Sequence, residues 1–270
     1  MSEETKLPSK KALNRYAALI DKVFFDNYVA GEKSFEFARK DLKKAATDLD
    51  IVLPDNLGDV IYSMRFRVAM PDAVLETQPA GLEWIIELAG KAIYRFRLTK
   101  KNRIIPSEHL AAIKIPDSTP EIIAKYTLDD EQALLAKVRY NRLLDIFLGI
   151  TTYSLQNHLR TTVKNMGQIE IDELYAGLDK YGCHYIIPVQ AKGGNDQISI
   201  VQTAQDIAWC AGKFPTLRCR PISAQFMANE VIAIFELSIQ DDEIKVVEER
   251  HYKLVPAKEL DNKEIANYRV

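Results

Sequence analysis

The segment from Gly167 to Lys192 constrains the fold more than any other part of the chain, because its residue pattern predicts a β-hairpin. Apolar and acidic residues alternate over 169–172, as they do in a strand with one buried and one polar face. Residues 179–182, Asp-Lys-Tyr-Gly, form turns readily, and 185–189 is rich in the β-branched and aromatic residues that favour a second strand. A turn centred near Tyr181 then sets the register of the two strands.

In that register, polar residues of both strands converge on one face. Asp172 lies opposite Gln190 and Glu170 lies opposite Lys192, and directly opposed residues of an antiparallel pair are roughly 5 Å apart. A slip of one residue would set Asp172 against Ala191 and mix the two faces. The other face carries the apolar residues that a core requires: Ile171, Ile187, Val189 and Ala191.

This set of polar groups is suited to metal-dependent hydrolysis of a phosphodiester. Mg²⁺ prefers hard oxygen ligands and usually takes one or two carboxylates together with neutral oxygens and waters. We predict Asp172 as the principal carboxylate ligand, Gln190 as a neutral oxygen ligand and Lys192 as the group that holds the attacking water or offsets phosphate charge. Glu170 or Glu173 adds a ligand, and alternation favours Glu170 because Glu173 belongs to the opposite face. Mn²⁺ can substitute for Mg²⁺ at such a site.

Residues 1–105 show a different pattern, which predicts a winged-helix-like DNA-binding domain. Helical spacing of apolar residues predicts helices over Lys10–Tyr28, from an N-cap at Ser34 to Leu49, and over Asn56–Phe66. Two strands, Glu83–Leu88 and Ala92–Leu98, follow as a tight hairpin. Three helices followed by a hairpin is the order of a winged helix-turn-helix.

In such a module the third helix enters the major groove and the hairpin contacts the DNA backbone. Polar residues of the third helix and of the hairpin over 83–98 are therefore predicted to contact DNA: Tyr62, Ser63, Arg65, Arg67, Arg95 and Arg97. Two residues upstream of the 167–192 hairpin are predicted to contact DNA as well, His158 and Arg160. The alternative is a small helical domain whose arginines are ordinary solvated surface. Residues 1–103 carry a net charge of +3 (18 Lys and Arg against 15 Asp and Glu), and the rest carries −5 (18 against 23).

The remainder of the chain predicts a mixed α/β domain. Prolines and weak periodicity mark 106–128 as an extended connector, and 129–270 forms the nuclease-like domain. A helix is expected over 129–150, whereas Tyr153–Val163 is compatible with a helix or a strand. After the hairpin we expect a helix and then strands: Ile198–Lys213, Leu217–Phe226, Val231–Leu237 and Ile244–Leu254. The result is a mixed sheet with helices packed on it.

The composition excludes several classes of protein. No run of 18 apolar residues is present, so the sequence predicts no transmembrane helix. Cys183, Cys210 and Cys219 are odd in number and have no CxxC spacing, which argues against a disulfide framework and a structural zinc site. The first 16 residues resemble no secretion signal, so the expected location is the cytoplasm.

The segment Ile169–Lys192, with Asp172 on one strand and Gln190-Ala191-Lys192 ending the next, resembles the PD-(D/E)xK core of restriction endonucleases. Blocks elsewhere resemble those of bacterial and archaeal restriction-endonuclease-like proteins, so the likeness spans most of the chain: Asn56–Arg67, Val138–Phe147, Tyr153–Val163 and Tyr185–Gly194. The resemblance implies a restriction-endonuclease-like core with a metal-dependent DNA-cleaving site. Two departures are Ile171, where the family has proline, and Gln190 in place of the usual acidic residue, a known variant.

These observations lead to one main hypothesis and two rivals. The main hypothesis is a Mg²⁺-dependent, type II restriction-like endonuclease acting on double-stranded DNA, as a homodimer with one site for each strand. One rival is a DNA-binding regulatory protein whose nuclease fold is catalytically inactive, and the neutral side chain of Gln190 favours this rival. The other rival is an enzyme that acts on RNA or on branched DNA. The simplest alternative for the hairpin is a surface element in which Glu170 and Lys192 form a weak ion pair and Asp172 begins a turn.

Overall fold

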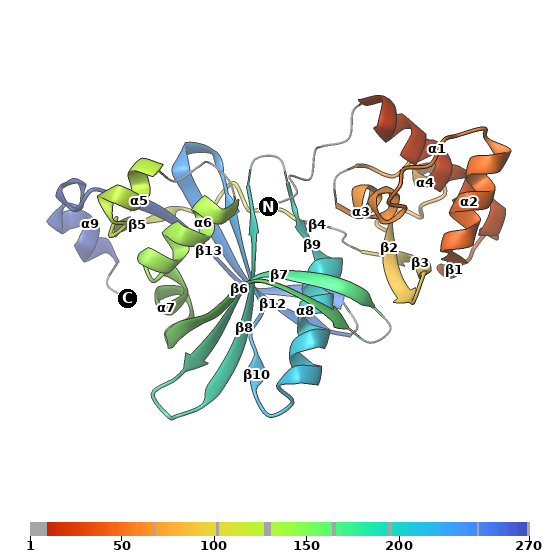
Figure 1. Cartoon of the computed structure of the whole chain (residues 1–270). Coiled ribbons are helices and arrows are strands. Elements are labelled where there is room, and N and C mark those ends of the chain that lie inside the picture. Colours follow the sequence, from red (N-terminus) through yellow and green to blue (C-terminus); the bar gives the residue numbers. More distant parts are fainter. Residues whose placement is uncertain are drawn as a thin grey trace. The chain divides into compact units, whose positions relative to one another are not determined.

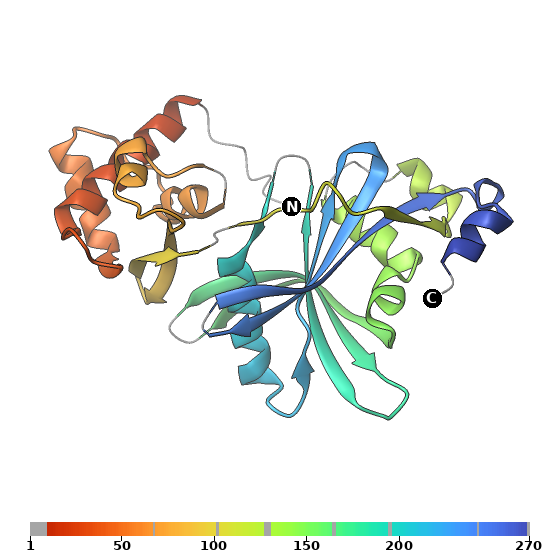
Figure 2. The same ribbon diagram turned by 180° about the vertical axis from the view of Figure 1, so that it is seen from behind.

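A computed structural model describes residues 10–66, 68–100, 103–126, 131–163, 166–193, 196–241 and 243–268. The chain divides into two compact units. Unit 1 comprises Met1–Asn102 with Lys164–Gly167, and unit 2 comprises Arg103–Val163 with Gln168–Val270. Unit 2 combines a large mixed sheet with helices, so the expected α/β class is confirmed (Figures 1 and 2).

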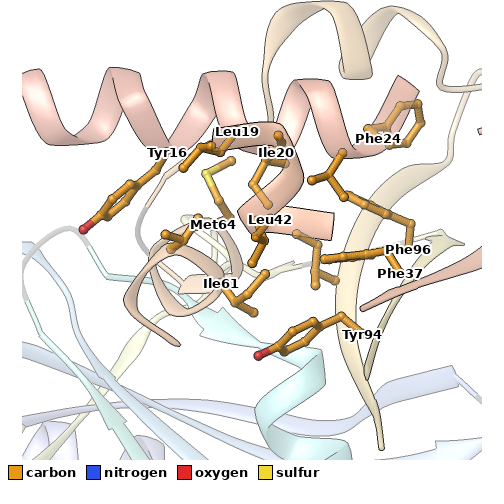
Figure 3. Packing of buried hydrophobic residues seen from close by; sticks show 14 of the residues in the cluster. Tyr16, Leu19, Ile20, Phe24, Phe37, Leu42, Ile61, Met64, Tyr94 and Phe96 are labelled. Carbon is orange, nitrogen blue, oxygen red and sulfur yellow. The ribbon is translucent and has the colours of Figure 1, made fainter. Parts of the chain in front are cut away.

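Unit 1 is built from short helices and one small sheet. Its elements are α1 (Lys10–Asn27), β1 (Ser34–Ala38), α2 (Arg39–Asp48), α3 (Gly58–Phe66), α4 (Asp72–Glu76), β2 (Glu83–Gly90) and β3 (Ile93–Thr99). The strands are antiparallel in the order β1-β3-β2. Buried side chains of the helices and the sheet form one apolar core, in which Leu19, Phe24 and Phe96 are fully buried (Figure 3). The predicted first helix, third helix and hairpin are confirmed.

One expectation for unit 1 was wrong, because Ser34 does not cap a helix. Residues Ser34–Ala38 form β1, which pairs with β3 so that Phe35 lies opposite Phe96 and Phe37 opposite Tyr94. Phe35 and Phe37 follow a two-residue period, which places both rings on the face of the strand that packs on the core. The helix begins only at Arg39, where the Asp41 carboxylate accepts a hydrogen bond from the Ala38 N–H at 2.7 Å.

Unit 2 contains an eight-stranded sheet within its described residues, in the order β5-β13-β12-β11-β8-β7-β6, with β10 paired to β8. The strands are β5 (Ala112–Pro116), β6 (Thr151–Val163), β7 (Gly167–Leu178), β8 (His184–Lys192), β10 (Arg218–Cys219), β11 (Ile222–Phe226), β12 (Val231–Gln240) and β13 (Glu243–Val255). The β8–β11, β8–β10 and β13–β5 pairs are parallel, and β7–β8, β11–β12 and β12–β13 are antiparallel. A two-stranded ladder joins β4 (Arg103–Ile104) to β9 (Ile198–Ser199).

Helices pack on both faces of this sheet (Figure 1). Tyr175 and Ile187 of the hairpin belong to a core shared with α6 (Glu131–Tyr140) and α7 (Leu143–Leu148). On the other face, Leu174 and Ile186 pack with Cys210 of α8 (Ile200–Lys213). Smaller elements are α5 (Glu121–Tyr126), α9 (Asn262–Asn267) and two 3₁₀ turns at Ala228–Glu230 and Ala257–Glu259.

Several segments of unit 2 differ from the expectation. The predicted connector contributes β5 to the sheet and includes α5. The helix expected over 129–150 is two helices, because Arg142 adopts a left-handed conformation with φ of 50° and ends the first. Tyr153–Val163, for which both a helix and a strand were open, lies within β6. The strand expected over 217–226 is interrupted at Pro221, which has no N–H to donate to a ladder.

No helix among the described residues is both long and apolar enough to cross a membrane. All three cysteines are unpaired thiols, as expected.

Candidate functional site

The hairpin has the predicted register. The ladder between β7 and β8 runs from Leu178 opposite His184 to Glu173 opposite Val189, which brings Asp172 to Gln190 as the next pair in this register. The Asp172 side chain lies at the position where this ladder ends. Its Oδ2 accepts a hydrogen bond from the Ala191 N–H at 2.9 Å, so the carboxylate is fixed against β8.

Asp172 is a half-buried carboxyl group with charged neighbours. Its removal from water raises its pKa, and the negative charge of Glu170 raises it further. Lys192 and the Ala191 N–H act in the opposite direction, since both favour the ionised form. A carboxylate held in this way gains from a nearby cation, because a positive charge offsets the cost of its burial.

Glu131 is a member of the site that sequence reasoning missed. It lies in the first turn of α6, and its Oε1 is 3.4 Å from Nζ of Lys192. Burial raises the pKa of Glu131, Lys192 lowers it, and Asp172 raises it again. Nothing in the sequence relates Glu131 to a strand 61 residues further on, because the contact exists only where α6 packs near the end of β8.

Asp206 is a second residue that the sequence did not single out. Gln190 Nε2 donates a hydrogen bond to Asp206 Oδ2 at 2.6 Å, and both side chains are buried, with 3% and 1% of their surface exposed. Burial raises the pKa of Asp206 well above its usual range. The sequence could have indicated Asp206 only by its position on the apolar face of a predicted helix, where burial of an acidic side chain is energetically unfavourable.

Glu170 does not contact Lys192 in the way that cross-strand pairing suggested. Its carboxylate lies 3.4 Å from Nδ1 of His158 and 3.4 Å from Nε of Arg160, both on β6. Those two residues, predicted to contact DNA, are exposed on this strand at the end of the sheet. His158 has a φ of 49°, a left-handed backbone conformation that residues other than glycine rarely adopt outside bulges and turns. Glu170 therefore contacts β6, whereas Lys192 contacts Glu131 at the start of α6.

Glu173, the other candidate ligand, points to the opposite face of the sheet, as alternation predicted. It is fully buried and forms an ion pair with Arg139 of α6. The Tyr175 hydroxyl donates to it at 2.6 Å, and the Asn157 amide, in its better-satisfied orientation, bridges Glu173 and Arg139. These partners satisfy the carboxylate on the α6 face, so Glu173 does not join Asp172.

The residues of α3 that were predicted to contact DNA differ in exposure. Tyr62 is 48% exposed, whereas Ser63 is 3% exposed. Ser63, predicted to contact DNA, is turned into the core by its position on the helix, so that prediction was wrong. Arg65 is half-buried, and Arg67 lies outside the described residues.

The two arginines of β3 lie in ion pairs across the small sheet. Arg95 is 2.6 Å from Glu36 of β1, and Arg97 is 2.5 Å from Glu87 of β2. Both arginine side chains keep part of their surface exposed. A phosphate that approached them would have to compete with these carboxylates.

The donor set at the hairpin fits a hard divalent cation that retains waters. No group of three or more His, Cys, Asp or Glu side chains able to hold a metal is found in the part of the chain that the structure describes. Mg²⁺ does not need such a cage, because one or two carboxylates with neutral oxygens are its usual protein ligands. Asp172 and the Gln190 Oε1 supply those types, and Glu131 supplies a second carboxylate nearby.

Comparison with protein-family models, with curated proteins and with solved structures gave no match.

Proposed function

We propose that this protein is a Mg²⁺-dependent endonuclease that hydrolyses phosphodiester bonds of double-stranded DNA. One observation carries the proposal: the β7–β8 register brings Asp172 to the Gln190-Ala191-Lys192 end of the next strand. A carboxylate, a carboxamide and an ammonium group thereby meet at the end of two paired strands. The proposed core is restriction-endonuclease-like, and its sheet and flanking helices support that assignment.

Each residue has a separate role in this proposal. Asp172 and Gln190 would hold the cation through oxygen atoms, with Glu131 or Glu170 as the additional carboxylate. A divalent cation bound there would neutralise phosphate charge and lower the pKa of a water nucleophile. Lys192, kept close by Glu131, would hold the attacking water or offset the charge that develops on the phosphate.

Unit 1 is proposed as a winged-helix DNA-binding module. Its support is the element order α1, β1, α2, α3, β2 and β3, with the short α4 between α3 and β2, and a β2–β3 hairpin that suits a wing. The exposed Tyr62 on α3 would contact DNA, and Arg95 and Arg97 would do so by exchanging their carboxylate partners for phosphates. We propose a homodimer, which provides two symmetry-related sites, and a cytoplasmic location.

A second candidate is a DNA-binding regulator whose nuclease fold has lost activity. The neutral Gln190 favours it, because that position contributes no charge to a cation site, and a site with fewer charged ligands binds cations more weakly. Such a protein would bind DNA equally well in EDTA and leave it intact.

Cleavage of unmethylated plasmid and phage DNA separates the two candidates. Wild type is compared in Mg²⁺, Mn²⁺ and EDTA with Asp172→Ala and Lys192→Ala, and Lys180→Ala is the matched control. Lys180 is an exposed lysine at the turn of the same hairpin, far along the strands from Asp172. Discrete fragments with wild type and Lys180→Ala, lost in EDTA and in both site variants, would support the nuclease. Uncut DNA that still shifts in a binding assay would favour the regulator.

A further inference from the structure

Gln190 and Asp206 form a buried carboxamide–carboxyl pair between β8 and α8, and this pair is unusual for the interior of a sheet protein. Only 3% and 1% of their surfaces are exposed. Burial of an acidic side chain is unfavourable unless its partners compensate for the lost water. In the described part of the chain, Asp206 Oδ2 accepts from Gln190, whereas the buried Oδ1 has no hydrogen-bond partner.

Only one of the two Asp206 carboxyl oxygens has a hydrogen-bond partner, so a contribution to stability alone does not explain an aspartate at this position. Buried polar groups in proteins are usually satisfied, and exceptions concentrate at functional sites. A purely structural position on the apolar side of α8 would be filled more favourably by an apolar side chain. Cys210, one turn further along α8, is an example of such an occupant.

The contact determines which end of the Gln190 amide faces the helix. The oxygen and nitrogen of a carboxamide are nearly equal in size, so shape alone does not select between the two orientations. Asp206 Oδ2 accepts at 2.6 Å, and a proton on this buried carboxyl would lie on the unpartnered Oδ1, so Oδ2 selects Nε2 for the α8 side. Oε1 is then the atom left for a cation, and a cation requires the oxygen, because an amide nitrogen is a donor and not a ligand.

We propose that Asp206 is a positioning residue, which holds the Gln190 carboxamide so that Oε1 serves as a ligand for the divalent cation beside Asp172. The inference rests on the proposed function, since it gives Gln190 a cation to bind. It also explains how a neutral glutamine serves as a cation ligand. A carboxylate at this position would present an oxygen in either orientation, whereas a carboxamide has to be held in one.

The test measures binding of Mn²⁺ alone by isothermal titration calorimetry, at a temperature where thermal unfolding shows each variant to be folded. Asp206→Ala is expected to weaken Mn²⁺ binding about tenfold to a hundredfold, the usual effect of losing an outer partner of a metal ligand. Asp206→Asn should bind within about threefold of wild type, because its amide oxygen still accepts from Gln190 Nε2. Thr203→Val, at another buried polar position of α8, is the matched control and should bind as wild type does.

A reversed pair provides the rescue. In the double variant Gln190→Glu with Asp206→Asn, the asparagine amide donates to one oxygen of the new carboxylate, and the other oxygen remains for the cation. We expect this variant to bind Mn²⁺ at least as tightly as wild type. In cleavage assays, Asp206→Ala should raise the Mg²⁺ concentration needed for half-maximal rate more than it lowers the rate at saturation.

Wild-type protein supplies a measurement that no folding defect can obscure. On addition of Mg²⁺, the side-chain resonances of Gln190 should shift in NMR spectra while the Nε2 protons stay protected from exchange. Unshifted resonances, lost protection, or a folded Asp206→Ala with wild-type Mn²⁺ affinity would overturn the proposal. If wild type neither binds Mn²⁺ nor cuts DNA, the proposed function itself fails. If wild type binds Mn²⁺ and the Asp206 variants bind it with the same affinity, only the positioning role is refuted.

Discussion

The buried ion pair between Glu173 and Arg139 provides the sharpest stability prediction. Glu173 is fully buried, whereas 35% of the Arg139 side chain is exposed. Arg139→Met would therefore leave a charge with no access to water, and breaking a buried pair from one side costs about 3 to 5 kcal/mol. The Tyr175 hydroxyl still donates to the carboxylate at 2.6 Å, so we expect the lower end, about 3 kcal/mol.

Removal of both charges should cost much less than removal of the arginine alone. In Arg139→Met with Glu173→Leu, the Asn157 amide also loses both partners, but this exposed side chain can bond to water instead. The remaining loss is a buried Tyr175 hydroxyl without its acceptor, which costs about 1 kcal/mol. The single and double variants should therefore differ by about 2 kcal/mol, with the double variant the more stable.

Urea unfolding of unit 2 can be followed by its own tryptophan. Trp84 belongs to unit 1 and Trp209 to α8 of unit 2, so a Trp84→Phe background leaves Trp209 as the reporter. Arg250→Met is the control, because its ion pair with Glu248 is exposed and should be worth less than about 1 kcal/mol. An Arg139→Met variant that is as stable as the double variant would refute the argument.

Three further predictions concern single positions of unit 2. Gly177→Ala should destabilise by about 1 to 3 kcal/mol in the same assay, because its Cβ would lie 2.8 Å from Ile150 Cδ1 and 3.0 Å from Ile187 Cδ1; an unchanged urea midpoint would contradict this packing. Gly212→Ala in α8 meets nothing within 4 Å and should raise stability by about 0.5 to 1 kcal/mol, so a lower midpoint would contradict it. Asp179 accepts hydrogen bonds from the Cys183 and Tyr181 N–H groups and from a tyrosine hydroxyl, with the Cys183 N–H as the main cause of its lowered pKa. A lowered pKa in the folded state means that this stabilisation is present above the unfolded pKa and lost as pH falls through the folded value. Asp179→Ala should thus be less stable than wild type at pH 7 and approach it in acid, as thermal unfolding across pH would show; a gap that persists in acid would contradict it.

Local patterns in the sequence were sufficient for much of the fold. Alternation and a short turn determine the β7–β8 hairpin, including the register that brings Asp172 to Gln190, because both properties depend on residues near in sequence. The opposite facing of Glu170 and Glu173 follows from the same two-residue period. The first helix and the β2–β3 hairpin were predictable for similar reasons.

Other features depend on contacts between distant segments, which no local pattern records. Ser34–Ala38 becomes a strand because β3, some 60 residues further on, offers a free edge and an aromatic face. Glu131 reaches Lys192, and Asp206 reaches Gln190, only after α6 and α8 have packed near β8. The hairpin and the face on which its polar groups lie thus follow from the order of the residues alone. Tertiary packing decided which carboxyl groups surround them, because helix placement depends on the shape of the whole apolar core and not on neighbouring residues.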